Sequence, residues 1–381
     1  MQGLLNSANF YLPFYDSGAG AVNTAEYYGT TPTFTRATVA WTKLASGLWA
    51  QVASGTARSF YTGFTTAVGT YAGYLAEGAR TQLVTPDANI RDMTGVGWAA
   101  VTMTVAKTAT GIDGVVNSAT TLTATGAGAT VLHLLVAAAS DRTYSAWIRR
   151  VTGTGTVKLV QGATKSSDFA GSINASTYTR VELDASVDVT LLGYGIELGT
   201  SGDVIEVDFN QFEAGAFAST PIPAAGARNA DVLTYPSTVI QASAGTIYID
   251  LLQIGVGARA YGVYATSVVD GSTELGLRVG GSGSAQAIFV WGDGAAANSI
   301  QSGALSASVS HKMACAWSTS TAAIAHDGVL DDSTSITNGA VVTTLAIGAN
   351  GGGAFPVFGP IRSVAYWNSR LPDATLQALT A

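Results

Sequence analysis

The chain has 381 residues, of which 47% are hydrophobic and only 11% are charged, less than half the usual charged fraction. Its formal net charge is −7, and its 18 Lys and Arg residues form no run longer than Arg149-Arg150, whereas phosphate binding needs clustered cations. No apolar run reaches the roughly 18 residues of a membrane-spanning helix. We therefore expect neither a nucleic-acid partner nor membrane insertion.

The first 85 residues hold short strand-like segments joined by glycine-rich stretches, at residues 10–14, 32–41 and 48–53. The opening residues lack a positive region ahead of an apolar core, so they do not resemble a secretory signal. A single cysteine, Cys315, excludes an intrachain disulfide. We expect an N-terminal β segment packed against the domain that follows it.

Better-defined strands follow from residue 86 onward. The sequence alternates cleanly from Tyr144 to Arg149, and Gly153 and Gly155 predict a hairpin turn into Val157. Seven or eight strands of this kind suit an antiparallel jelly roll. They are predicted at residues 99–105, 129–135, 142–150, 156–161, 179–183, 188–192 and 204–212.

The last of these strands contains a phase slip. Alternation holds up to Asn210, but Phe212 rejoins the apolar face only if one residue near Asn210 or Gln211 is extra, which predicts a β-bulge. Pro221 and Pro223 then end the ladder, because neither has a backbone N–H. We predict that two sandwiches meet within residues 214–233.

The remainder of the chain predicts a second sandwich. Asp327-Gly328 between two strand-like segments is a hairpin signature. From Pro372 the period becomes helical, with Leu376 and Leu379 on one face. The fold class is therefore all-β, with two antiparallel β-sandwiches after an N-terminal β segment. Strands of the second sandwich are predicted at residues 245–252, 259–267, 274–280, 285–291, 311–318, 322–326, 343–347 and 359–367.

Four stretches resemble a family of surface proteins of tailed-bacteriophage virions. They are TPTFTRAT at 31–38, GYLAEGARTQLV at 73–84, the junction at 204–233 and GPIRSVAYWNSRLPDATLQALT at 359–380. The second has Gln82 where the family usually has Asn. The resemblance implies a carbohydrate-binding-module-like jelly roll at 86–232 and a concanavalin A-like lectin/glucanase (LamG-like) domain at 233–381. Residues 1–85 would be an N-terminal β segment and a candidate for virion attachment.

The resemblance implies a non-enzymatic structural protein of the virion surface, synthesised in the host cytoplasm. Such a protein would be a tail or baseplate adhesin that binds host-surface polysaccharide. Its other partners would be tail, baseplate or capsid proteins and further copies of itself, with a trimer favoured because tail appendages usually follow threefold axes. A capsid decoration protein or head fibre, and a polysaccharide depolymerase, remain alternatives. No cofactor is expected.

Glu206, Asp208 and Glu213 are candidates for catalysis, since retaining glycoside hydrolysis uses two carboxyl groups about 5 to 5.5 Å apart. Glucanases of the lectin-like fold carry Glu-x-Asp-x-x-Glu on one strand, and here Glu213 follows Asp208 by five residues, which is too far. We expect these acids to lie on a solvated polar face and predict no catalytic residue.

Metal binding is equally unsupported. His133, His311 and His326 show no ligand spacing, and Cys315 alternates with Trp317 as a buried hydrophobe would. The acids at 327–332 could donate oxygens to calcium but lack the spacing of a recognised loop, so we interpret them as turn residues.

A glycan site is the remaining hypothesis, because aromatic faces stack on sugar rings while amides and carboxylates bind hydroxyl groups. Trp291, Asp293 and Asn298 surround a glycine-rich loop, and Tyr261 lies in a neighbouring predicted strand, as does Tyr264. The alternative is that Trp291 belongs to the core and the loop is merely polar. Trp147, Trp317 and Trp367 alternate with apolar neighbours and are predicted to be core residues.

Overall fold

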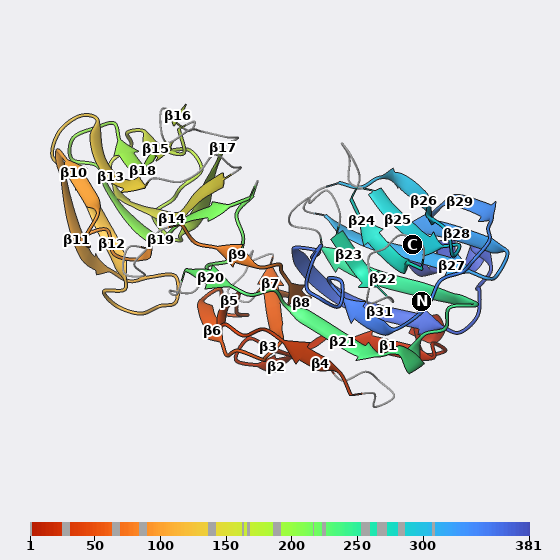
Figure 1. Cartoon of the computed structure of the whole chain (residues 1–381). Coiled ribbons are helices and arrows are strands. Elements are labelled where there is room, and N and C mark those ends of the chain that lie inside the picture. Colours follow the sequence, from red (N-terminus) through yellow and green to blue (C-terminus); the bar gives the residue numbers. More distant parts are fainter. Residues whose placement is uncertain are drawn as a thin grey trace. The chain divides into compact units, whose positions relative to one another are not determined.

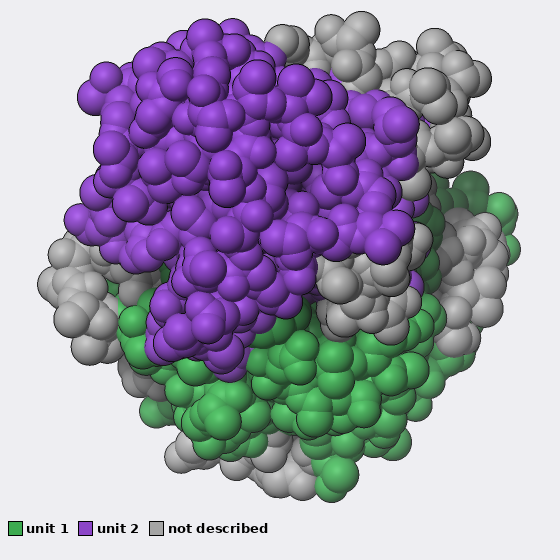
Figure 2. Space-filling view, turned by 90° about the vertical axis from the view of Figure 1, so that its left-hand side faces the viewer, with its two compact units in different colours: residues 1–47, 51–79, 229–381 green, residues 48–50, 80–228 purple. Residues whose placement is uncertain are grey.

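The computed structural model describes residues 2–24, 31–62, 69–83, 90–135, 142–161, 164–165, 168–185, 192–215, 217–222, 226–252, 260–264, 273–280, 286–306 and 309–381 (Figure 1). The chain forms two compact units, coloured separately in Figure 2. Unit 1 comprises Met1–Gly47, Gln51–Ala79 and Asn229–Ala381, and unit 2 comprises Leu48–Ala50 and Arg80–Arg228. Both are antiparallel β-sandwiches, so the predicted all-β class is confirmed. No described helix has the length and apolar character that a membrane span requires.

The larger sheet of unit 1 has, among the described residues, the strand order β2-β3-β7-β8-β31-β22-β27-β28-β29, and β1 also pairs with β31. Its strands are β1 Phe10–Pro13, β2 Tyr15–Gly18, β3 Ala21–Asn23, β7 Arg58–Thr62, β8 Thr70–Ala76, β22 Gly245–Leu252, β27 Ser310–Trp317, β28 Thr321–His326, β29 Val329–Ser335 and β31 Gly359–Trp367.

The second sheet of unit 1 has the order β26-β25-β24-β23-β30-β21-β4. Its strands are β4 Thr33–Thr35, β21 Val232–Pro236, β23 Ala260–Tyr264, β24 Leu275–Val279, β25 Gln286–Gly292, β26 Ala297–Ala304 and β30 Thr344–Ile347. Unit 1 also contains β5 Ala40–Lys43 and the 3-10 turn η2 Ser237–Val239.

The main core of unit 1 lies between these two sheets and takes buried side chains from both, such as Ile249 and Trp317 from one and Leu277 and Phe289 from the other. Two helices, α1 Gln2–Leu5 and α2 Asp373–Thr380, contribute to a second apolar cluster on the other face of the larger sheet. Leu376 and Leu379 are fully buried there, which confirms the predicted helix and its apolar face.

The N-terminal segment belongs to this C-terminal sandwich. β1 pairs with β31 in the register Leu12↔Val364, and β8 pairs with the start of the same strand at Tyr74↔Ile361. The expectation that the segment packs on the following domain is therefore wrong. Its apolar residues complete the core of unit 1, and no local pattern identifies the strand with which a segment pairs.

Unit 2 consists of two five-stranded sheets and a short ribbon in the described part of the chain. One sheet has the order β10-β13-β18-β15-β16, with strands Trp98–Val101, Ala129–Leu135, Leu192–Leu198, Val157–Gln161 and Thr164–Lys165. The other has the order β11-β12-β19-β14-β17, with strands Met103–Ala109, Ala119–Ala124, Val204–Ala214, Arg142–Thr152 and Thr179–Ala185. The ribbon pairs β9 Arg80–Thr81 with β20 Ala227–Arg228, and β6 is Trp49–Val52.

Two local predictions in unit 2 meet different outcomes. The bulge in β19 is confirmed, because Phe209 and Asn210 together oppose the single residue Ala146, and Phe209 has a φ of 45°. The hairpin predicted around Gly153 is wrong. β14 pairs with β17 and β19, whereas β15 pairs with β16 and β18, so this connection crosses from one sheet to the other. The glycines supply a turn, but they do not determine the partner strand.

The turn at Asp327-Gly328 is confirmed in unit 1. It joins β28 to β29 as a two-residue hairpin in which Asp327 has a φ of 44° and Gly328 a φ of 83°, as a type I′ turn requires. Trp317 and Trp367 are core residues as predicted. Trp147 is only partly buried, because Ala146 and Ile148 take the inner face of β14 and turn its ring outward, next to Trp49.

Candidate functional site

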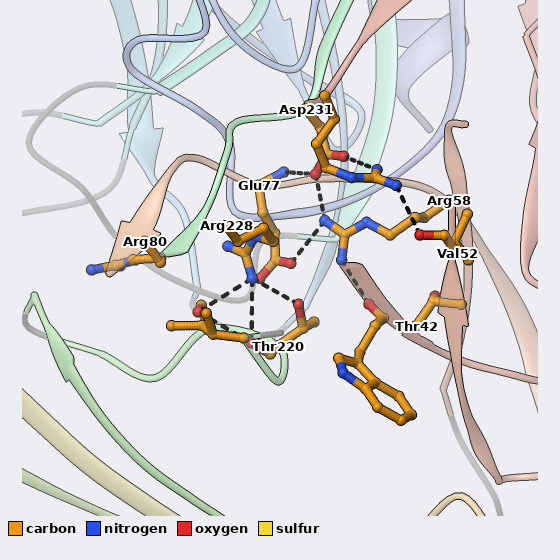
Figure 3. Close-up of polar contacts among 12 residues, drawn as sticks. Thr42, Val52, Arg58, Glu77, Arg80, Thr220, Arg228 and Asp231 are labelled. Carbon is orange, nitrogen blue, oxygen red and sulfur yellow. Dashed lines mark hydrogen bonds and ion pairs between the residues drawn. The ribbon is translucent and has the colours of Figure 1, made fainter. Parts of the chain in front are cut away.

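Residues from three of the stretches that resemble the phage family meet in one buried charge network of unit 1 (Figure 3). Arg36 Nη1 lies 2.7 Å from Asp231 Oδ1, and Arg58 Nη2 lies 3.0 Å from Glu77 Oε2 and also contacts Asp231 Oδ2. All four side chains are at most 6% exposed. The backbone N–H of Glu77 donates to Asp231 as well. Because each guanidinium group pairs with a carboxylate of the same network, we interpret the network as a structural feature that stabilises unit 1.

The predicted glycan residue Trp291 does not face solvent. It is only 5% exposed, stacks on Phe289 with ring centroids 5.5 Å apart, and lies in the main core of unit 1. Its Nε1 donates to the carbonyl oxygen of Thr337 at 3.1 Å. The ring therefore cannot stack on a sugar in this structure, and the core alternative describes it correctly.

Asp293 and Asn298 satisfy each other in the β25–β26 turn. Asn298 Nδ2 donates to Asp293 Oδ2 at 3.0 Å, while Asp293 Oδ1 accepts from the backbone N–H groups of Ala295 and Ala296. These hydrogen bonds lower the pKa of Asp293, and the one from the N–H of Ala296 has the largest effect. The side chain of Tyr261 lies outside the described residues. The four predicted residues therefore do not form a described binding surface.

The three acids considered for catalysis are held in structural contacts rather than on a solvated face. Asp208 is fully buried and accepts from Arg91 Nε at 2.8 Å and from the N–H of Ile112 at 2.8 Å. Burial raises the pKa of Asp208. Glu213 accepts from both the N–H and the hydroxyl of Ser219 at 2.8 Å. Glu206 accepts from Arg149 Nε at 2.7 Å.

The histidines of unit 1 occur in two His–carboxylate pairs. His311 Nδ1 lies 2.6 Å from Asp327 Oδ2, and His326 Nδ1 lies 2.7 Å from Asp331 Oδ2. No group of three or more potential metal ligands of the His, Cys, Asp and Glu types occurs in the described part of the chain. Cys315 is fully buried, and burial raises the pKa of its thiol.

A polar and aromatic cluster lies in unit 2 where several strands begin or end. In one sheet, Trp98, His133, Tyr194 and Gln161 lie directly opposite one another on neighbouring strands. Directly opposed residues in an antiparallel sheet project from the same face. These four residues therefore form a row across that sheet.

The row faces the other sheet. The Tyr194 ring lies parallel to that of Phe212 at a centroid distance of 5.0 Å, and it meets the Tyr144 ring edge-on at 5.3 Å. The Tyr144 hydroxyl hydrogen-bonds to Asn210 Oδ1. Arg142 begins β14, two residues before Tyr144, and is 1% exposed. We name these residues the strand-end cluster: Trp98, His133, Arg142, Tyr144, Gln161, Tyr194, Asn210 and Phe212.

Many polar atoms of the strand-end cluster are buried without a hydrogen-bond partner in the part of the chain that the structure describes. Leaving a buried polar group unsatisfied costs about 1–3 kcal/mol, and more for a charged group. So many unsatisfied groups in one cluster are unusual in a folded protein. The atoms are the three guanidinium nitrogens of Arg142, Nε2 and Oε1 of Gln161, Nδ2 of Asn210, Oη of Tyr194 and Nε1 of Trp98.

The sequence carried only a partial signal for this cluster. His133 stands in a predicted strand among apolar neighbours, where a polar residue is unusual. Arg142 lies between Asp141 and Thr143 and gives no such signal. Whether the strands of His133 and Arg142 face each other depends on the topology of the sandwich, and no local sequence pattern indicates that topology. Burial lowers the pKa of His133.

Comparison with known proteins gives no family. No family model matches the chain, and no curated protein matches it. Among solved structures, the Ruminococcus gnavus IT-sialidase CBM40 bound to α2,3-sialyllactose has a TM-score of 0.32 and 19% identity, with 38% of this chain and 86% of that chain covered. Domain 4 of AbnA, a Geobacillus stearothermophilus arabinanase bound to arabinotriose, has a TM-score of 0.33 and 13% identity, with 44% and 81% covered. A Limulus polyphemus SAP-like pentraxin has a TM-score of 0.30 and 14% identity, with 39% and 72% covered. At such TM-scores we infer neither the fold nor the function of this chain from these structures.

Proposed function

We propose that this protein is a non-enzymatic glycan-binding component of the surface of a tailed-phage particle, acting as a tail or baseplate adhesin. Its ligand would be a host-surface polysaccharide, and its other partners would be virion proteins and further copies of the chain. The observation that supports the glycan part is the strand-end cluster, which a glycan would reach only if this end of the unit 2 sandwich opens, because the cluster is buried. Aromatic rings there adjoin amide, hydroxyl and guanidinium groups that have no partner among the described residues.

The virion part rests on the resemblance, and the arrangement of unit 1 supports treating its motifs as one structure. The stretch at 31–38 contributes Arg36, and the stretch at 73–84 contributes β8 and Glu77, while Asp231 comes from the junction at 204–233. The last stretch contributes β31, which pairs with β8, and α2. Parts of all four stretches, which are far apart in sequence, thus lie in unit 1 and are linked by these contacts.

Two measurements test the proposal. Purified protein should bind intact host cells and lose that binding after chemical or enzymatic removal of the surface polysaccharide. An antibody to the protein should label the tail end of purified particles in electron micrographs. Labelling over the whole head would indicate a capsid decoration protein or head fibre instead, and absence of label from particles would contradict the virion assignment.

A separate assay addresses the depolymerase alternative and the oligomeric state. Incubation with host polysaccharide should release no new reducing ends, and a steady release would show an enzyme. Light scattering at micromolar concentration should give a homo-oligomer, with a trimer expected for a tail appendage. A monodisperse monomer that is also absent from particles would contradict the proposed assembly.

A further inference from the structure

One edge of the larger sheet of unit 1 carries an acid and two tyrosines on the same face. Strands β2, β3, β7 and β8 are neighbours in that order (Figure 1). Asp16 lies opposite Val22, and Tyr61 lies opposite Tyr71. Directly opposed residues of an antiparallel pair project from the same face. Val22 belongs to the main core and Tyr71 packs against it, so these side chains all point to the inner face of the sheet.

This edge is open to solvent. All four residues of β2 are exposed, and Asp16 is one of them. Tyr61 and Tyr71 are half-buried. A ligand can therefore reach the edge without any opening of the sandwich, whereas most side chains of the strand-end cluster are buried. We name Asp16, Tyr61 and Tyr71 the tyrosine–aspartate surface.

Hydrogen bonds and ring packing hold this surface in place. The Tyr61 hydroxyl donates to Asp16 Oδ2 at 2.9 Å, and the N–H of Gly18 donates to Asp16 Oδ1 at 3.1 Å. Burial and, after it, the hydrogen bond to Asp16 raise the pKa of Tyr61 to about 12, so its hydroxyl remains protonated at neutral pH. The Tyr71 ring meets the Tyr61 ring edge-on, with centroids 5.5 Å apart. The carboxylate and the Tyr61 ring are thus oriented before a ligand binds.

The carboxylate of Asp16 can accept further hydrogen bonds. An ionised carboxylate has about four lone-pair sites, and the hydroxyl of Tyr61 and the N–H of Gly18 occupy two of them. In the part of the chain that the structure describes, no Lys, Arg or His side chain pairs with Asp16. Hydrogen bonds to an ionised acceptor are roughly twice as strong as neutral ones. The remaining sites therefore suit the hydroxyl groups of a ligand.

The Tyr61 ring beside this carboxylate adds an apolar surface, on which the C–H groups of a sugar ring can pack. An aromatic side chain with a few well-placed polar groups is typical of sites for small ligands. A carboxylate without a neighbouring cation repels a second anion, so an acidic sugar does not fit this surface. An uncharged sugar residue, which donates through its hydroxyl groups, fits it best.

We propose that the tyrosine–aspartate surface of unit 1 binds an uncharged sugar residue, with Asp16 accepting hydrogen bonds from its hydroxyl groups and Tyr61 packing on its ring. The inference rests on the proposed glycan-binding function and gives that function a ligand class and a contact site that is open to solvent. Because the sugar carries no charge, its binding should depend little on salt.

The test uses the full chain and short oligosaccharides of known composition. Oligomers of glucose, galactose, mannose and rhamnose are compared by calorimetry with oligomers of glucuronate and of glucosamine. At least one uncharged oligomer should bind, and about 0.5 M salt should change its affinity less than about twofold. Tighter binding of the glucuronate or glucosamine oligomer than of every uncharged oligomer would show that charge determines recognition and would contradict the proposal.

The deciding variant is Asp16→Asn, which keeps the shape of the side chain and an oxygen acceptor but removes the charge. Affinity for the uncharged oligomer should fall about tenfold or more, because hydrogen bonds to charged groups contribute more than neutral ones. Tyr61→Leu should also weaken binding, since it removes the ring. Tyr61→Phe keeps the ring and should have a smaller effect, which comes from the loss of the hydroxyl that orients Asp16.

Two control variants lie on other parts of the same sheet. Tyr15→Ala removes an exposed ring whose side chain points to the opposite face of β2, and Asp332→Asn removes an exposed acid on β29. Both should bind the oligomer as the wild type does. Asp16→Asn should melt within a few degrees of the wild type, because Asp16 is exposed. A much lower melting temperature would show that Asp16 is needed for folding and would overturn the proposal.

The binding outcomes separate the inference from the function on which it rests. If Asp16→Asn and Tyr61→Phe both bind host polysaccharide and the uncharged oligomer as the wild type does, the inference is overturned and the adhesin proposal stands. If the wild type binds neither host polysaccharide nor any oligomer, both are overturned. Loss of binding in Asp16→Asn together with wild-type binding in Tyr15→Ala and Asp332→Asn is the result that supports the proposed site.

Discussion

Trp291 shows how a single side chain is placed by its strand. On β25, Ala287, Phe289 and Trp291 share one face, which packs into the main core. Ile288 and Val290 on the other face are also buried, in a smaller cluster. Both faces of this strand are apolar, so periodicity could not show which one opens to solvent. Gly292 ends the strand and Gly294 lies in the turn beyond it, so the glycine-rich loop does not expose the Trp291 ring.

We predict that Trp291→Ala lowers the free energy of unfolding by about 3–5 kcal/mol, because it leaves a cavity the size of an indole ring in the core. Urea denaturation followed by circular dichroism measures this change. Tyr15→Ala is the control, since Tyr15 is 48% exposed and its loss should cost far less. An unchanged midpoint for Trp291→Ala would mean that the ring is not part of the core.

The turn between β25 and β26 depends on the charge of Asp293. The hydrogen bonds from Ala296, Ala295 and Asn298 favour the ionised carboxylate, which is why the pKa of Asp293 lies below its ordinary value of 3.8. A carboxylate whose pKa is lowered by folding stabilises the fold above the unfolded pKa, and that stabilisation is lost as the pH falls through the folded pKa.

Asp293→Ala should therefore reduce the denaturation midpoint at pH 7 and at pH 5 by the same amount. The difference from the wild type should shrink at pH 3, because the wild-type carboxylate is then becoming protonated. Asp293→Asn keeps an oxygen acceptor and should fall between the two proteins at pH 7. A difference that does not depend on pH would show that the charge of Asp293 does not contribute to the turn.

The charge network of unit 1 joins elements that the sequence separates widely. Arg36 lies just after β4, Glu77 just after β8 and Asp231 just before β21. Asp231→Asn should lower the free energy of unfolding by about 3–5 kcal/mol, since it removes the carboxylate that pairs with Arg36 and one of the two that pair with Arg58. The control is Arg362→Gln, because Arg362 is 47% exposed and its pair with Asp250 should contribute about 1 kcal/mol or less.

Over the whole chain, local features of the fold could be predicted from the sequence, whereas the pairing of strands could not. The all-β class, the β19 bulge, the Asp327-Gly328 turn and α2 each depend on a few consecutive residues, whose pattern the sequence displays. The pairing of β1 and β8 with β31 joins residues that are very far apart in the sequence, as in Leu12↔Val364 and Tyr74↔Ile361. The strand-end cluster could not be predicted for the same reason, since its members come from six strands of two sheets.

The connectivity makes unit 2 an insertion into unit 1. The N–H of Asp231 donates to the carbonyl oxygen of Glu77 at 2.9 Å. The two chain segments that connect unit 1 to unit 2 therefore begin next to each other. Within unit 2, Arg80 and Arg228 are likewise opposed in the β9–β20 ribbon. We therefore predict that Ala79 can be joined to Asn229 by a short glycine linker and that unit 1 still folds, because both of its sheets and its main core remain.

The excised protein should keep a β-rich circular dichroism spectrum and unfold cooperatively. It needs Trp49→Ser, because Trp49 belongs to unit 2 and would lose the Trp147 ring that lies 5.3 Å away. The complementary fragment of residues 80–228 should also fold, although less stably than in the whole chain, since the Trp49 contact is missing. If the excised protein is unfolded while the fragment folds, unit 1 requires unit 2, and the charge network alone does not hold its segments together.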